Sequence, residues 1–158
     1  MGAPRRPVAP IRIVVVDDSK AFVSALRRLL DEEQWIEVVA HTFSAVEAIA
    51  TVARLQPDLV LTDVDMPGMC GLDMVRHLKG GASPPLVIVI TFSPEYKSHA
   101  LESGADGFVV KDEVVGVLLP LVRDLFTARL KARPSKAARS RSSTFSNTRR
   151  SAARLSRG

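Results

Sequence analysis

Five short apolar segments alternate along this chain with segments of helical periodicity, and this alternation is what most constrains the fold. The apolar segments are residues 11–16, 36–40, 58–62, 85–91 and 107–110. They are rich in Val, Ile and Leu and too short for buried helices, which is typical of strands covered on both faces. Strands that alternate with helices build parallel sheets, so we predict an α/β fold with a doubly wound, five-stranded parallel sheet.

The first predicted helix has a clear beginning and a clear buried face. Ser19 follows the first apolar segment and is expected to cap the helix through its hydroxyl oxygen. From Phe22 to Leu30, apolar side chains recur at i, i+3, i+4, i+7 and i+8, which places them on one side of a helix. We therefore expect Phe22 to be a packing residue.

The other helices are predicted from caps and breakers. Ser44 followed by Glu47 is a capping box that opens a helix running to about residue 55. Further helices are predicted at residues 72–79, from a cap at Ser93 with Pro94 and Glu95 in its first turn, and finally towards residue 131. Pro120 lies inside the last of these, so that helix either kinks there or begins near Leu119.

Polar side chains lie at the ends of four of the five predicted strands. Asp17 and Asp18 come directly after the first strand and Asp63 after the third, while Thr91 ends the fourth and Lys111 follows the fifth. Because the carboxyl ends of parallel strands line one edge of a sheet, and ligands bind there, these five residues are predicted to form one cluster.

The chemistry of this cluster is set by its carboxylates. Three carboxylates in one pocket repel one another, and a bound cation or a retained proton is the usual remedy. An all-oxygen ligand set favours Mg²⁺, which often shares its coordination shell with a phosphoryl group. The ammonium and the hydroxyl would then contact the remaining phosphoryl oxygens. The strand ends therefore predict phosphoryl transfer onto a carboxylate.

Four segments resemble the receiver domains of two-component response regulators. They are VVVDDS (14–19), LTDVDMPGMCGLDMV (61–75), VIVITFS (87–93) and GADGFVVKD (104–112). The resemblance covers residues 11–128 and implies a (βα)5 fold of flavodoxin-like (CheY-like) topology. It also implies a function, in which a sensor histidine kinase or a histidine phosphotransferase donates a phosphoryl group and the modified domain controls a partner protein.

The resemblance implies a role for each acidic residue. Asp63 would be the phosphoacceptor. Asp18 would be a direct ligand of Mg²⁺, Asp17 a ligand acting largely through water, and the backbone carbonyl of Asp65 would complete the metal shell. The domain would carry out only its own phosphorylation and dephosphorylation, so it would be a signalling domain and not an enzyme with a separate substrate.

The resemblance also implies a conformational switch. Thr91 would hydrogen-bond a phosphoryl oxygen on Asp63, Lys111 would form an ion pair with the phosphoryl group, and Phe108 matches the aromatic switch residue of the family. Movement of Thr91 and rotation of Phe108 would alter the surface formed by the fourth helix, fifth strand and fifth helix. A downstream partner, or a second copy of the chain, would bind this surface.

Three positions differ from the common family pattern. Phe92 follows Thr91 where small residues are usual, and its ring is expected to narrow access to the site. Asp65 adds a carboxylate at the mouth, which is expected to slow or redirect attacking water. Asp112 follows Lys111 where many members have a proline after a cis bond. A cis bond before a non-proline residue costs about 2.5–4 kcal/mol, so the sequence leaves the isomer open.

Charge divides the chain into a short N-terminal extension (1–10), the receiver region (11–128) and a basic tail (129–158). The tail holds ten Lys and Arg residues and no acid, whereas the remainder holds twelve against seventeen acids, so a +10 tail follows a −5 region. With few large apolar residues, the tail is predicted to be disordered. It either contacts nucleic acid, an anionic membrane or an acidic protein, or it has no specific partner.

Hydropathy and the single cysteine indicate where in the cell the protein is located. No apolar run approaches the ~20 residues that cross a bilayer, and the single cysteine, Cys70, fits a reducing compartment, so a cytoplasmic protein is expected.

Asp63 and Asp65 also resemble the DxD pair of haloacid-dehalogenase-like phosphatases, although Met66 and Pro67 do not continue that motif. Within the receiver family, residues 10–40 look like chemotaxis methylesterases and residues 104–112 like receivers joined to helix-turn-helix domains. The chain holds no GxSxG motif, which favours a stand-alone receiver.

Overall fold

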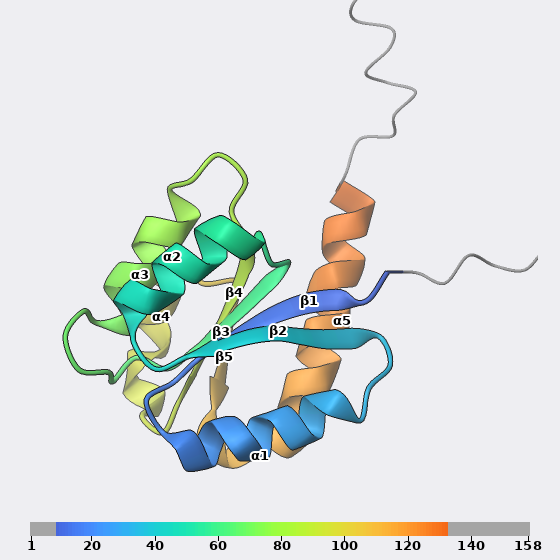
Figure 1. Cartoon of the computed structure of the whole chain (residues 1–158), viewed down its shortest axis with the longest axis horizontal. Helices are drawn as coiled ribbons and strands as arrows, with labels where there is room; N and C mark the ends of the chain where they lie inside the picture. Colours follow the sequence, from blue (N-terminus) through green and yellow to red (C-terminus); the bar gives the residue numbers. More distant parts are fainter. Residues whose placement is uncertain (1–8, 133–158) are drawn as a thin grey trace, which may run out of the picture. The chain divides into compact units, whose positions relative to one another are not determined.

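The computed structural model describes residues 9–132, and its strands form one parallel sheet (Figure 1). The strands are β1 (Ile11–Val16), β2 (Ile36–Thr42), β3 (Leu59–Thr62), β4 (Leu86–Thr91) and β5 (Gly107–Val110). The helices are α1 (Lys20–Asp31), α2 (Ala45–Leu55), α3 (Gly71–Lys79), α4 (Lys97–Glu102) and α5 (Val114–Ala132). The strand order β2-β1-β3-β4-β5, with all pairs parallel, confirms the predicted (βα)5 flavodoxin-like fold.

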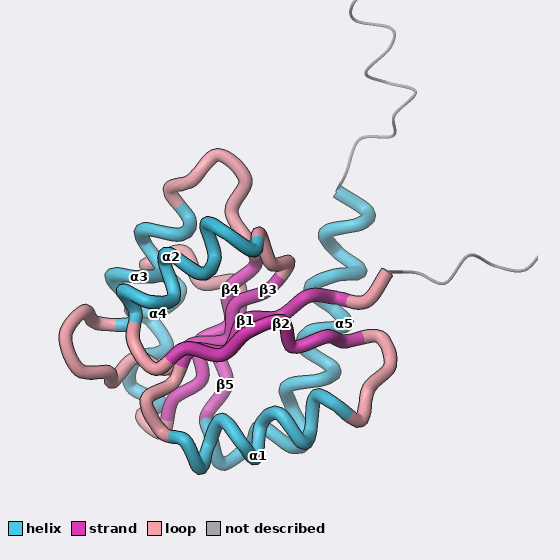
Figure 2. The backbone as a smooth tube through the Cα atoms, in the orientation of Figure 1, coloured by secondary structure: helices cyan, strands magenta, loops and turns pink. Residues whose placement is uncertain are grey.

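Helices cover both faces of the sheet. Helices α2, α3 and α4 lie on one face, and α1 and the first turns of α5 lie on the other (Figures 1 and 2). Along β1, Val14 and Val16 belong to the core beneath α2, α3 and α4, and the alternation of a strand directs Ile13 and Val15 to the opposite face. Because every residue of β3 is buried, this strand is central, and its carboxyl end lies in the middle of the ligand-binding edge.

The caps of the first two helices are confirmed. The Phe22 backbone N–H donates to Ser19 Oγ at 3.3 Å, and the Glu47 backbone N–H donates to Ser44 Oγ at 3.2 Å. The Glu47 carboxylate accepts from the Phe43 N–H at 3.4 Å, one residue before the cap, so the capping box closes slightly earlier than its standard form.

The beginning of α4 differs from the prediction. Ser93 makes no side-chain cap, because residues 94–96 form a 3₁₀ turn (Pro94–Tyr96) in which the Tyr96 N–H donates to the Ser93 backbone oxygen at 3.3 Å. The α-helix proper begins only at Lys97. Pro94 therefore correctly predicts that a helical turn begins here, but it does not predict that the turn is of the 3₁₀ type.

The last helix continues through Pro120. A 3₁₀ turn at Lys111–Glu113 leads directly into α5 at Val114, so the predicted alternative of a start near Leu119 is wrong. Pro120 has no N–H to donate to the carbonyl of Gly116, and both residues are exposed, so water can serve that carbonyl instead. The helix continues to Ala132, beyond residue 128.

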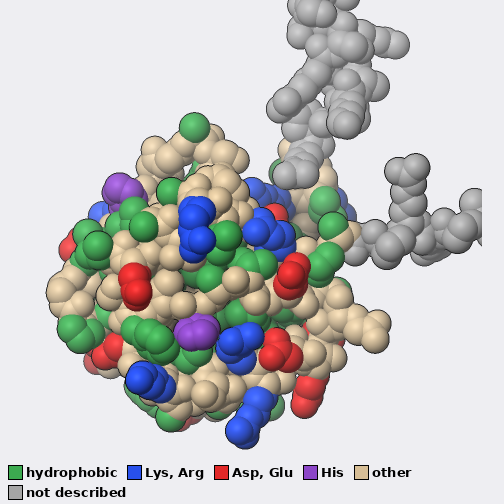
Figure 3. All heavy atoms as spheres, viewed as in Figure 1, with side chains coloured by type: hydrophobic (Ala, Val, Ile, Leu, Met, Phe, Trp, Pro, Cys, Tyr) green, Lys and Arg blue, Asp and Glu red, His purple; other side chains and the backbone are tan. Residues whose placement is uncertain are grey.

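The surface of the described region mixes charges of both signs. On the face drawn in Figure 3, Lys and Arg side chains are interspersed with Asp and Glu. No helix within residues 9–132 is long and apolar enough to cross a membrane. The predictions for the N-terminal extension up to residue 8 and for the basic tail from residue 133 fall outside the described residues.

Candidate functional site

The three predicted carboxylates meet at the carboxyl ends of β1 and β3. Parallel pairing of Val16 with Thr62 brings the following residues side by side, and the Asp63 N–H donates to the Val16 oxygen at 3.0 Å. Carboxylate oxygens of Asp17, Asp18 and Asp63 lie within 4.8 Å of one another. Asp17 and Asp63 are buried and Asp18 is exposed, so the cluster opens to solvent on the Asp18 side.

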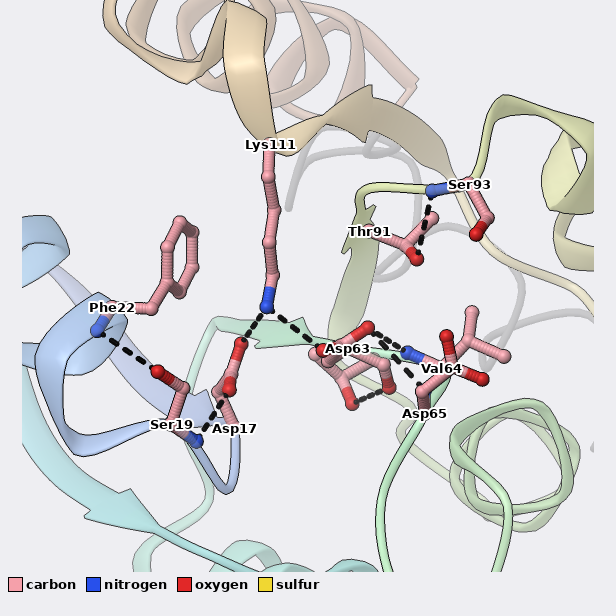
Figure 4. Close-up of polar contacts among 10 residues, drawn as sticks. Asp17, Ser19, Phe22, Asp63, Val64, Asp65, Thr91, Ser93 and Lys111 are labelled. Carbon is pink, nitrogen blue, oxygen red and sulfur yellow. Dashed lines mark hydrogen bonds and ion pairs between the residues drawn. The ribbon is translucent and has the colours of Figure 1, made fainter.

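Lys111 joins this cluster from the end of β5 (Figure 4). Its side chain is only 4% exposed, and its Nζ lies 2.7 Å from Asp17 Oδ2 and 2.8 Å from Asp63 Oδ2. Three acidic strand-end residues and one basic one are therefore brought together, as the sequence predicts. One ammonium faces three carboxylates, so the site retains an excess of negative charge.

Burial and charge shift the pKa values of this ion pair. Burial raises the pKa of Asp17, and the hydrogen-bonding and charge of Lys111 lower it by less. Burial of the Lys111 ammonium lowers its pKa, but Asp17 and Asp63 together outweigh burial, so the pKa of Lys111 lies above its ordinary value. Lys111 is therefore held as a cation at neutral pH.

Both oxygens of the Asp63 carboxylate are fixed. Oδ1 accepts from the backbone N–H groups of Val64 at 2.6 Å and Asp65 at 3.3 Å, and Oδ2 accepts from Lys111 Nζ. These donors lie on the loop after β3 and at the end of β5, so two separate elements orient one carboxylate. An oriented carboxylate in a mostly buried site is suited to act as a nucleophile.

Gly71 allows α3 to pack closely against the backbone of Asp63. It is not among the residues predicted from the sequence. A Cβ at Gly71, the first residue of α3, would lie 2.0 Å from the Asp63 carbonyl oxygen and 3.0 Å from the Asp63 carbonyl carbon. Only a residue without a side chain lets α3 approach this closely. The signal in the sequence was a glycine at the first position of a helix, where glycine has no advantage of its own.

Thr91 and Phe108 lie on the strands beyond Asp63. Thr91 ends β4, is 1% exposed, and accepts a hydrogen bond from the Ser93 N–H at 3.3 Å (Figure 4). Phe108, in β5, is half-buried and packs against the core on the α2–α3–α4 face, as does Tyr96. The switch roles of Thr91 and Phe108 stay predictions.

The donor set fits a hard divalent cation. All its side-chain donors are carboxylate oxygens, and Asp17 Oδ2, although paired with the Lys111 charge, has no well-directed hydrogen bond. Closely spaced carboxylate oxygens that one ammonium only partly neutralises suit Mg²⁺, which prefers oxygen ligands. The contribution of the Asp65 backbone carbonyl stays a prediction, and the Asp65 side chain itself is exposed.

Two phenylalanines border the Lys111 ammonium. Phe22, predicted only as a packing residue, has its ring centre 4.3 Å from Nζ, and the ring centre of Phe92 lies 5.1 Å from it. Phe92 is 63% exposed, which places it at the mouth of the site. None of the peptide bonds described is cis, so the bond between Lys111 and Asp112 is trans.

Asp65 interacts with Tyr96 across the mouth. The negative charge of Asp65 is the largest influence on Tyr96 and raises the pKa of its phenol above 10.0, because a phenolate beside a carboxylate is disfavoured. We expect Asp65→Asn to shift the alkaline titration midpoint of Tyr96 downward. Tyr96 is the single tyrosine, so ultraviolet absorbance of folded protein measures it directly.

Glu95→Gln is the matched control for that titration, since Glu95 affects Tyr96 less than Asp65 does. We expect a smaller shift for Glu95→Gln than for Asp65→Asn. Equal midpoints for the wild type and Asp65→Asn would contradict this influence of Asp65 on the pKa of Tyr96.

Comparison with known proteins places the chain in a family. The family model for the response regulator receiver domain matches residues 13–123, so the chain belongs to that family. A response regulatory protein of Yersinia pestis is 36% identical over 119 residues, which cover 73% of this chain and 50% of that protein. Protein-glutamate methylesterase/protein-glutamine glutaminase 5 of Myxococcus xanthus is 34% identical over 142 residues, which cover 82% of this chain and 41% of that protein.

A solved structure agrees with these relatives. The response regulator domain of Thermotoga maritima CheB matches with a TM-score of 0.68 and 26% identity, covering 73% of this chain and 95% of that one. The predicted receiver family is thus confirmed, and the family match favours it over the haloacid-dehalogenase-like alternative. The chain spans about half the length, or less, of the two curated relatives named above.

Proposed function

We propose that this chain receives a phosphoryl group on Asp63, with Mg²⁺ bound, and thereby switches the surface that it offers to a partner. The donor would be a phosphohistidine of a sensor histidine kinase or of a histidine phosphotransferase. The observation that carries the proposal is the environment of Asp63: a largely buried carboxylate, oriented by two backbone N–H groups, that shares one ammonium with Asp17.

Each residue of the cluster would have its own role in the phosphoryl transfer. An Asp63 carboxylate oxygen attacks phosphorus, and the bond from phosphorus to the donor nitrogen breaks as the new oxygen–phosphorus bond forms. Lys111 offers its ammonium to the transferred oxygens, and Asp17 and Asp18 would hold Mg²⁺ together with Asp63. When bound, Mg²⁺ would neutralise charge that accumulates on the phosphoryl oxygens.

The switch would begin at Thr91. Its hydroxyl now accepts from the Ser93 N–H, and Ser93 leads directly into the 3₁₀ turn before α4. If Thr91 turns towards the phosphoryl group, this bond is lost and the segment before α4 is released. Phe108 lies in β5, the strand next to β4, and would fill the space that the Thr91 side chain leaves.

The surface affected would be that of α4, β5 and the beginning of α5. Exposed apolar side chains already lie on its helices, including Leu101 on α4 at 48% exposure and Val115 on α5 at 80%. A downstream partner, or a second copy of the chain, would prefer one of the two surfaces and so respond to phosphorylation. We place this exchange in the cytoplasm. Contact between the basic tail and nucleic acid stays a prediction.

The proposal is tested with a small phosphodonor. We expect acetyl phosphate with Mg²⁺ to add one phosphoryl group, detected by intact mass, and we expect Asp63→Asn or removal of Mg²⁺ by a chelator to abolish the addition. Asp73→Asn is the matched control, because Asp73 is an exposed carboxylate on α3 that pairs with Arg76. Modification that persists in Asp63→Asn would refute the assignment of the acceptor.

A further inference from the structure

The ammonium of Lys111 is enclosed by two carboxylates and two aromatic rings. The carboxylates of Asp17 and Asp63 lie at 2.7 and 2.8 Å, and the ring centres of Phe22 and Phe92 at 4.3 and 5.1 Å. Both ring distances are within the range of about 6 Å in which a cation is attracted to the negative face of an aromatic ring. Three of the four groups directly follow β1, β3 and β4 and the fourth lies in α1, so the fold assembles them from separate parts of the chain.

Backbone structure positions the residues that carry the two rings. Phe22 lies in the first turn of α1, and its N–H is bonded to the capping Ser19. Phe92 directly follows β4, whose last residue, Thr91, is fixed by its pairing with Val110. The exposure of Phe92, 63%, means that burial alone does not account for its position at the mouth.

The two carboxylates alone would not fix the ammonium over the acceptor. Nζ is as close to Asp17 as to Asp63, so the ion pairs permit it to move towards either residue. The rings limit this movement from other directions. They also cannot accept a conventional hydrogen bond, so the N–H groups of Lys111 need break no strong bond with them when a phosphoryl oxygen arrives.

We propose that Phe22 and Phe92 form an aromatic clamp that positions the Lys111 ammonium for the phosphoryl group on Asp63. The role of the clamp rests on the proposed phosphoacceptor function. Its geometry is independent of that function. Phe22 and Phe92 are positioning residues, since they act through Lys111. At the position of Phe92, a ring is favoured over an aliphatic side chain of similar bulk.

The geometry is tested in the unmodified protein. The Lys111 Nζ lies over both rings, so we expect the nuclear magnetic resonance signals of the protons on the adjacent carbon to be shifted upfield by the ring currents. Phe22→Leu and Phe92→Leu should each remove part of this shift. Phe43→Leu is the control, because Phe43 lies near Lys20 instead, with the Lys20 Nζ 5.9 Å from its ring centre. Lys111 signals that do not respond to either clamp substitution would overturn the proposal.

The function of the clamp is tested by the rate of phosphorylation with acetyl phosphate and Mg²⁺. We expect Phe92→Leu to slow phosphorylation about twofold to fivefold, the effect of losing one cation–π contact at a partly exposed site. Phe92→Tyr and Phe92→Trp, which keep a ring, should restore the rate. Fluorinated phenylalanines at position 92 weaken the ring charge at nearly constant size, and they should slow the reaction stepwise.

The outcomes separate the two proposals. If Phe92→Leu is as fast as the wild type, or faster, the ring is at most a steric cover and the clamp is refuted. If the wild type itself takes up no phosphoryl group from acetyl phosphate or from a phosphohistidine donor, the proposed function fails, and the resonance experiment still decides whether the clamp exists.

Discussion

Lys111→Met is expected to lower the free energy of unfolding by about 3 kcal/mol at neutral pH and without divalent cations, as is usual when one partner of a buried ion pair is removed. The side chains of Lys111, Asp17 and Asp63 are 4%, 2% and 9% exposed, so water replaces the lost ammonium poorly. Methionine keeps most of the volume of lysine, and the loss therefore reports charge and not packing. Urea denaturation measures it.

A second substitution should recover part of this loss. With the ammonium gone, Asp17 and Asp63 are two carboxylates that repel one another, so adding Asp17→Asn to Lys111→Met removes one of the unpaired charges. We expect the double variant to be more stable than Lys111→Met alone. The difference from additivity is the coupling energy of the pair.

The exposed ion pair of Arg76 with Asp73 is the internal control. Its side chains are 56% and 61% exposed, and Arg76→Met should change stability by less than about 1 kcal/mol, as is typical of surface pairs. If Lys111→Met were as mild as Arg76→Met, the buried ion pairs would contribute little, and the account of Lys111 as the cation that holds the cluster together would be wrong.

The excess of acid at the site links stability to function. Three carboxylates face one ammonium in the unmodified protein, and the proposed phosphorylation would raise the negative charge at Asp63 from one to about two. Lys111 alone cannot balance this charge, which is the physical reason for expecting a divalent cation. Burial is the main reason that the pKa of Asp17 is raised even beside a lysine, and the negative charge of Asp63 adds a smaller contribution in the same direction.

The acidic cluster could be predicted because it depends on topology alone. Asp17, Asp63 and Lys111 each directly follow an apolar segment, and a parallel sheet gathers whatever follows its strands at one edge. No knowledge of side-chain positions was needed. The register of β1 with β3 then supplied the distances that the sequence could not.

The aromatic neighbours of Lys111 could not be predicted in this way. Helical spacing assigned Phe22 to the face of α1 that packs on the sheet, and periodicity does not show that the first turn of this face borders the site. Phe92 was recognised as bulky, but its direction depends on the path of the chain after β4. Contacts between side chains on different elements require the fold to be assembled first.

The start of α4 and the course of the last helix were not predictable, for a related reason. Pro94 and Pro120 are equally strong breakers in the sequence, yet the first begins a 3₁₀ turn and the second lies within α5. The difference lies in what surrounds them. The 3₁₀ turn at Lys111–Glu113 already directs the chain into a helix, whereas Ser93 follows a strand and is bonded back to Thr91.

Gly71→Ala is expected to be the most damaging small substitution in the described region. Its Cβ would lie 2.0 Å from the Asp63 carbonyl oxygen, far inside any van der Waals contact, and the obstructing atoms are backbone and cannot rotate away. Either α3 or the segment after β3 must move. Forced overpacking of a core costs about 1–3 kcal/mol and occasionally more, and we expect a value at the upper end, about 3 kcal/mol, measured by urea denaturation.

Gly116→Ala separates this clash from the general effect of replacing a glycine in a helix. Gly116 lies in α5, and nothing is within 4 Å of the position of its added Cβ, so alanine should stabilise the protein by about 0.5–1 kcal/mol. In Gly71→Ala, any molecules that still fold should also phosphorylate slowly, because the displaced backbone carries the Asp63 carboxylate and the Val64 N–H that orients it. Normal stability and normal phosphorylation of Gly71→Ala would show that α3 does not hold the acceptor in place. The same added methyl group is expected to destabilise the protein at Gly71 and to stabilise it at Gly116, because it meets backbone atoms at the first position and open space at the second.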